Sequence, residues 1–117
     1  MQGSNGDLWY RDVTGTNADT TIGMKAGTSP SVAAPSTGGY ELAAQANTGE
    51  LYLRNVSGSN IDTTLGMAGS TSPSIYGTKI AAQANTGELW LNEISTNTNS
   101  DTTLGMAGST SPSISAE

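Results

Sequence analysis

The chain of 117 residues contains no cysteine and no histidine. Without these two residue types, the usual nucleophile–base pairs and the usual zinc ligand sets are missing. The carboxylates Asp7, Glu50 and Glu88 are widely spaced along the chain, so they do not form the close acid–base pair of a glycosidase. We therefore predict that the protein is not an enzyme, with no catalytic residues, no metal site and no cofactor.

Positive charge is also scarce. The chain carries a net charge of −6, and its basic residues are Arg11, Lys25, Arg54 and Lys79. Nucleic acids and anionic membranes are bound by clusters of Lys and Arg, so we expect neither as a partner. No apolar run is long enough for a transmembrane helix, and no signal peptide precedes Gln2.

Almost the whole chain consists of three related repeats. The first motif of each repeat has an acidic residue, a leucine and an aromatic residue after a glycine, at Gln2–Trp9, Gln45–Tyr52 and Gln83–Trp90. An Asp-Thr-Thr motif follows at 19–24, 62–67 and 101–106, before a Ser-Pro-Ser step. A period of roughly 40 residues is typical of repeat architectures, in which each copy needs neighbours to bury its faces. We expect a single domain, 1–117, with units at about 1–28, 29–71 and 72–110.

Alternating apolar and polar residues predict strands at Asp7–Arg11, Glu50–Arg54 and Glu88–Asn92. The leucines of these strands, Leu89 among them, are expected to face the core. A further strand lies upstream at 40–45 and 78–83, joined to the next by an Asn-Thr-Gly hairpin turn. The segments 63–67 and 72–75 predict the remaining strands, and no segment has helical periodicity. The predicted fold class is all-β, with about four short strands per repeat.

The aspartates of the second motif have a predicted local role. Asp19, Asp62 and Asp101 each precede two threonines, and we expect their carboxylates to accept hydrogen bonds from nearby backbone N–H groups.

Two architectures use four-stranded units of this length, the β-propeller and the monomeric β-trefoil. The strings Ala43–Tyr52, Leu65–Met67 and Ser72–Ile75 resemble tandem repeats of secreted actinobacterial proteins and blades of bacterial seven-bladed propeller lectins. They are more loosely similar to tachylectin-type propellers. The sequence departs from those blades at Thr64, where a tryptophan is often found, and in the absence of phenylalanine. The resemblance implies a β-propeller, a secreted location and carbohydrate binding.

Three blades do not close a propeller ring, because the end blades would expose whole sheet faces. We expect the ring to be closed by homo-oligomerisation, and a homodimer would give six blades. The C-terminal segment 111–117 is predicted to supply a strand that completes a neighbouring unit, a form of strand exchange.

Aromatic residues recur at one position of each repeat and share a strand face with polar side chains. Sugars are bound by stacking on such rings while polar groups engage their hydroxyls. The predicted ligand-binding residues are Trp9, Arg11, Tyr52, Arg54, Trp90 and Asn92. The alternative is that the rings fill the space between blades.

Two functions from different classes follow from these patterns. The first is a lectin-like, carbohydrate-binding propeller module, in which repeated weak sites combine into useful avidity. The second is a ligand-free structural repeat protein, designed or excised, that self-assembles into a propeller.

Overall fold

The computed structural model describes residues 2–3, 6–11, 15, 17–34, 40–55 and 57–114. All the regular secondary structure in these ranges is β-strand, which confirms the predicted all-β class. None of the described segments forms a helix that could cross a membrane.

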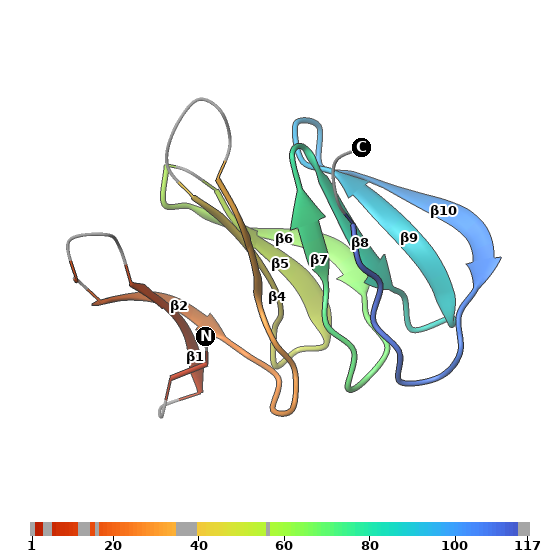
Figure 1. The fold of residues 1–117 in the computed structure, drawn as a ribbon, viewed down its shortest axis with the longest axis horizontal. Helices are drawn as coiled ribbons and strands as arrows, with labels where there is room; N and C mark the ends of the chain where they lie inside the picture. The colour runs from red at the N-terminus through yellow and green to blue at the C-terminus, as the bar shows by residue number, and fades with distance from the viewer. Residues whose placement is uncertain are drawn as a thin grey trace.

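The described strands form three antiparallel sheets that follow one another along the chain (Figure 1). The first sheet contains β1 (Asp7–Arg11) and β2 (Asn17–Gly23). The second contains β3 (Ser31–Ala33), β4 (Glu41–Gln45), β5 (Glu50–Arg54) and β6 (Asn60–Gly66). The third contains β7 (Ser74–Tyr76), β8 (Lys79–Gln83), β9 (Glu88–Glu93) and β10 (Thr98–Gly105). The two larger sheets confirm four strands per repeat, each paired with its neighbour in sequence.

The Asn-Thr-Gly segments form the predicted hairpin turns. The amide of Gly49 donates to the carbonyl of Ala46 over 2.8 Å, and Gly87 donates to Ala84 over 2.9 Å. Both glycines have positive φ, at 91° and 93°, a region that residues with a side chain rarely occupy.

The outer strands contain a conformation that the alternation pattern does not predict. Thr21, Thr64 and Thr103 have φ angles of 64°, 64° and 63° within β2, β6 and β10. In each repeat the preceding aspartate accepts a hydrogen bond of 2.8 Å from the amide of this threonine, which confirms the predicted local role of the aspartates. The pairing of β5 with β6 shifts register between Glu50 and Tyr52, so the Asp-Thr-Thr motif forms a bulge in the outer strand.

Backbone hydrogen bonds join each sheet to the next near the hairpin turns. Asn47 donates to the carbonyl of Gly23 over 2.8 Å, and Asn85 donates to Gly66 over 2.9 Å. The approach is close at these glycines, because a Cβ atom on Gly66 would lie 2.5 Å from the side-chain nitrogen of Asn85. Equivalent contacts therefore recur at both junctions between sheets.

The hydrophobic core lies between the sheets. One cluster joins the first and second sheets and includes Leu8, Ile22 and Leu42. The other joins the second and third sheets, and its members include the buried residues Ala43, Leu51, Leu53, Leu65, Met67, Ile80 and Ala82. The second sheet thus presents one face to the first sheet and the other face to the third sheet.

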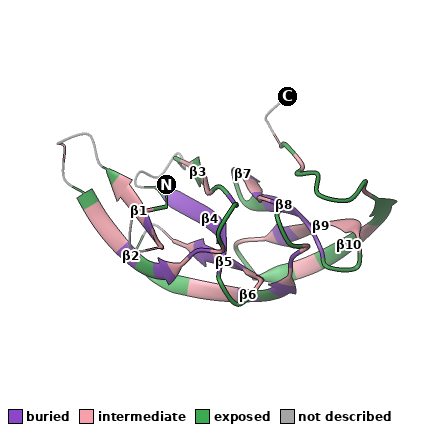
Figure 2. Ribbon diagram, turned by 90° about the horizontal axis from the view of Figure 1, so that it is seen from below, coloured by how far each residue is buried: buried purple, intermediate pink, exposed green. Residues whose placement is uncertain are grey.

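The outward face of the third sheet has no such neighbour among the described residues. Leu51 and Leu53 of the second sheet are fully buried, whereas the equivalent Leu89 and Leu91 are only half-buried. Leu104 is 60% exposed, although its equivalent Leu65 is 6% exposed. Figure 2 shows exposed residues along β10, in contrast to the buried β4. The prediction that Leu89 faces a core is therefore met only in part, because no sheet in the described part of the chain packs on its face.

Candidate functional site

The predicted aromatic residues lie at different junctions and do not form a single cluster. Tyr52, on β5, is half-buried and packs on the core between the first and second sheets. Trp90, on β9, is half-buried and packs on the core between the second and third sheets. Trp9 occupies the equivalent position on β1, where no described sheet precedes it. The rings are thus spaced one to a repeat, and those of Tyr52 and Trp90 lie on the face that points toward the preceding sheet.

Acidic groups surround the aromatic position of the second sheet. Tyr52 lies opposite Asp62 in the pairing of β5 with β6. The nearby Asp62 carboxylate, partial burial and Glu50 together raise the pKa of the Tyr52 hydroxyl. In the first sheet, burial and the neighbouring Asp19 carboxylate raise the pKa of Asp7. Despite these acidic neighbours, no group of three or more potential metal-binding side chains is present among the described residues.

Arg54 is held in a contact between two sheets. Its Nη1 atom donates to the side-chain oxygen of Asn60 over 3.1 Å and to the carbonyl of Thr20 over 3.2 Å. Asn60 donates to the same Thr20 carbonyl over 2.8 Å. Thr20 belongs to β2, so two donors of the second sheet converge on one backbone acceptor of the first sheet.

The junction between the second and third sheets repeats this arrangement with an amide in place of the guanidinium. Asn99 donates to the carbonyl of Thr63 over 2.7 Å. Asn92, which is buried, donates to the side-chain oxygen of Asn99 over 2.7 Å and holds it in place. We call the two side chains that act in this way a junction clamp: Arg54 with Asn60, and Asn92 with Asn99.

The first sheet carries the same pair. Arg11 donates to the side-chain oxygen of Asn17 over 3.1 Å. This bond joins the same atoms, at the same distance, as the bond from Arg54 to Asn60. Both side chains are exposed. Arg11 and Asn17 therefore form a third junction clamp, whose acceptor is not supplied by any described sheet of this chain.

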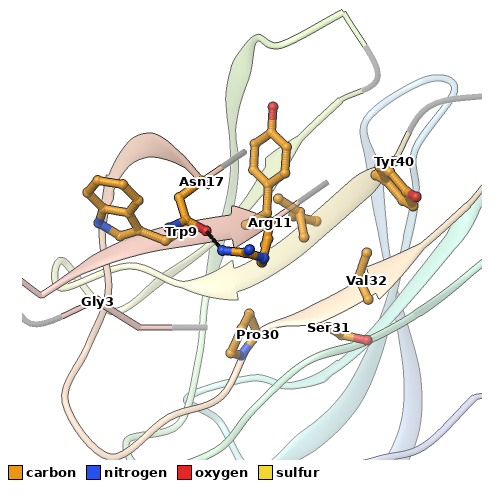
Figure 3. A pocket seen from close by; sticks show the side chains of 10 residues that line it. Gly3, Trp9, Arg11, Asn17, Pro30, Ser31, Val32 and Tyr40 are labelled. Atoms are coloured by element: carbon orange, nitrogen blue, oxygen red, sulfur yellow. Dashed lines mark hydrogen bonds between the residues drawn. The ribbon is translucent and has the colours of Figure 1, made fainter. Parts of the chain in front are cut away.

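A groove of about 980 Å³ lies between the first and second sheets beside this clamp (Figure 3). Its lining residues are Gly3, Trp9, Tyr10, Arg11, Asn17, Pro30, Ser31, Val32, Tyr40 and Leu42. Among the described residues, the first sheet consists of β1 and β2 alone, whereas the other two sheets have four strands each. The groove lies at the position that the first two strands occupy in the larger sheets.

Trp90 and Asn92 also contain buried polar atoms without a hydrogen-bond partner among the described residues. These are the indole Nε1 atom, which donates, and the side-chain Oδ1 atom, which accepts. The two residues lie two positions apart on β9, so their side chains share one face of the strand. Among the described residues, this face of β9 therefore carries one unpaired donor and one unpaired acceptor, both of them buried.

Sequence reasoning identified Arg11, Arg54 and Asn92 as polar partners of the aromatic rings, but it missed the asparagines that complete the clamps. The signal was present, because Asn17, Asn60 and Asn99 each stand two residues before an Asp-Thr-Thr motif.

Comparisons of the chain with protein-family models, curated proteins and solved structures found no match. The proposals for its function therefore depend on its own residues.

Proposed function

We propose that this chain is a self-assembling β-propeller module, in which the three sheets are consecutive blades and further copies close the ring. The observation that carries the proposal is the difference between equivalent leucines. Leu65 is 6% exposed beneath the third sheet, whereas Leu104 is 60% exposed on the outward face. Burying an apolar side chain of this size is worth about 1.5–3 kcal/mol, so the outward face favours a covering sheet.

An exposed residue of the second sheet supports the proposal from the other end of the row of sheets. Val32 on β3 is 59% exposed, whereas its equivalent Ile75 on β7 is 5% exposed. Ile75 is covered because β3 lies beside it and Ser31 accepts a hydrogen bond from its amide over 3.1 Å. No described strand lies beside Val32 in the way that β3 lies beside Ile75. This end of the row therefore lacks a covering strand, and the segment after β10 lies at the other end.

The segment after β10 continues the series of first strands. The amide of Ile114 donates to Ser74 over 3.1 Å, and the amide of Ser72 donates to Ser111 over 2.9 Å. Ile75 with Ser31 and Ser29 with Ser72 make the same bonds one repeat earlier. The segment thus begins a fourth unit, and β1 and β2 of another copy would continue it.

Propeller rings contain roughly four to eight blades. A head-to-tail homodimer would supply twice the three sheets of one chain, and it falls within this range. Two copies are therefore the assembly that we propose.

The test is a substitution on the outward face, followed by sedimentation equilibrium. Leu104→Asp places a charge where the second copy would dock, and we expect it to reduce the mass to that of one chain. The chain itself should stay folded, because Leu104 is already exposed. Thr96→Asp, in the exposed turn between β9 and β10, is the matched control and should leave the mass unchanged. If Leu104→Asp has the same assembled mass as the unmodified protein, the proposed assembly is wrong.

Carbohydrate binding is a second candidate function, and the pair of unpartnered atoms on Trp90 and Asn92 favours it. An aromatic ring beside a donor and an acceptor provides the contacts that a sugar ring with its hydroxyls uses. Titration with monosaccharides and a glycan array would test this function. Binding should weaken in Trp90→Phe, which lacks the indole N–H, and should persist in Tyr76→Phe, an exposed aromatic residue on β7. Failure to bind any sugar would leave only the assembly function.

A further inference from the structure

We propose that Arg11 and Asn17 of one copy donate hydrogen bonds to the Thr102 carbonyl of a second copy, and that this clamp sets the head-to-tail direction of assembly. This inference rests on the proposed self-assembly and names the atoms that recognise the partner.

The two internal junctions show what such a clamp binds. At the first, Arg54 and Asn60 converge on the carbonyl of Thr20, at 3.2 and 2.8 Å. At the second, Asn99 reaches the carbonyl of Thr63 at 2.7 Å. In both cases the acceptor belongs to the threonine just before the positive-φ threonine, on the outer strand of the preceding sheet.

The acceptor of the third sheet has the same local geometry. Thr103 has a φ of 63°, its amide donates to Asp101 over 2.8 Å, and its hydroxyl donates to the Thr102 carbonyl over 2.6 Å. The corresponding distances around Thr64 are 2.8 and 2.5 Å. The Thr102 carbonyl therefore has the same local geometry as the carbonyls of Thr20 and Thr63. It lies at the exposed end of the row of sheets. A carbonyl oxygen has two lone pairs, so the existing bond leaves room for a second donor.

The donor pair is already assembled in the single chain. Arg11 is bonded to Asn17 over 3.1 Å, with the Asn17 side-chain NH₂ group left to donate elsewhere (Figure 3). A Cβ atom at Gly15 would lie 3.1 Å from the Arg11 guanidinium, and at Gly58 it would lie 3.4 Å from Arg54. Glycine leaves space for the guanidinium at both places. Pre-organised side chains lose less conformational entropy on binding, which favours this pair as a docking group.

The clamp also makes the assembly directional. The equivalent donors of the second and third sheets are already bonded to carbonyls within the chain. Among the described residues, only Arg11 and Asn17 remain as donors of this kind, and only Thr102 remains as the equivalent acceptor. Two outward faces packed against each other would bury leucines but would bring together two acceptors and no clamp. The second copy is thus expected to dock with its first sheet on the third sheet of its neighbour.

The experiment compares two matched double variants by sedimentation equilibrium and thermal unfolding. Arg11→Ala with Asn17→Ala should weaken association by roughly 10- to 100-fold, as expected for hydrogen bonds that include a charged donor. Unfolding of the isolated chain should be unaffected, since both side chains are exposed. Arg54→Ala with Asn60→Ala removes the same atoms from an internal junction, and it should instead lower the unfolding midpoint of the isolated chain.

Asn17→Asp provides a second readout, because it keeps the shape and the contact to Arg11 but removes the NH₂ donor. Association should again weaken. If the unmodified protein assembles and both variants at this clamp assemble equally well, the clamp is wrong while the self-assembly stands. If the unmodified protein remains a single chain at every concentration, both proposals are wrong.

Discussion

At the scale of single residues, the threonines with positive φ are the least expected feature of the chain. A residue with a branched Cβ in this region carries a backbone cost of about 1–3 kcal/mol. Local hydrogen bonds compensate for this cost. In the second sheet, the Asp62 carboxylate accepts from the amide of Thr64. The Thr63 hydroxyl donates to the Leu51 carbonyl and accepts from the Leu65 amide. The carbonyls that accept from the next sheet belong to Thr20 and Thr63, so the strained residues stand beside the polar contacts between sheets.

The packing role of the aromatic position leads to a prediction about Trp90. Trp90→Ala should lower the free energy of unfolding by about 3 kcal/mol, because the ring packs on the buried cluster around Leu51 and Leu53. Leu51→Ala is the reference for a fully buried side chain and should cost about 2–5 kcal/mol. Denaturant titrations of both variants would measure these costs. A loss below about 0.5 kcal/mol for Trp90→Ala, the range of ordinary surface substitutions, would show that the ring is not part of the core.

The sequence predicted which aromatic and polar residues recur, but it could not decide what they contact. Arg54 and Asn92 stand at the same position of their repeats, and pattern alone assigned both to a ligand. Their partners are a carbonyl of the preceding sheet and an asparagine across a hairpin. Such contacts depend on how sheets stack, which the alternation within one strand does not encode.

At the scale of strands, a pattern with a period of two was sufficient to locate β1, β5 and β9. It was less successful for the outer strands. The prediction began at Thr63, whereas β6 begins at Asn60. The positive φ of Thr64 interrupts the alternation, and residues 60–62, with the polar Asn60 and Asp62, then resemble a loop.

The ion pair between neighbouring strands predicts a pH dependence. Lys79 on β8 is bonded to Glu93 on β9, and these residues lie opposite each other in the sheet. Hydrogen bonds from Lys79, with smaller contributions from Thr78 and Ser95, lower the pKa of Glu93 from 4.5 to about 2. Because the folded pKa is the lower one, the stabilisation is fully present above pH 4.5 and is lost as the pH falls toward 2.

Lys79→Ala should therefore lower the unfolding midpoint near neutral pH, and the difference from the unmodified protein should shrink as the pH falls through this window. Thermal unfolding followed by circular dichroism at several pH values would measure it. The effect should be small, since exposed ion pairs contribute little to stability. A difference that stays constant between neutral pH and pH 2 would contradict the assignment.

At the scale of the whole molecule, the repeats predicted a row of similar units but not the burial of each one. Leu51 and Leu89 stand in nearly identical sequences, and only the presence of a following sheet separates full burial from half burial. The proposed assembly requires the two ends of the row to be complementary. One offers the exposed Leu104 and the Thr102 carbonyl, and the other offers Val32 and the pair Arg11–Asn17.

The native mass of the unmodified protein tests this complementarity most directly. One chain has a mass of 11.8 kDa, and native mass spectrometry or light scattering should return twice that value if two copies close the ring. Dilution should shift the species toward the single chain without unfolding it. A compact particle of 11.8 kDa that persists at every concentration would contradict self-assembly and would favour a closed monomer.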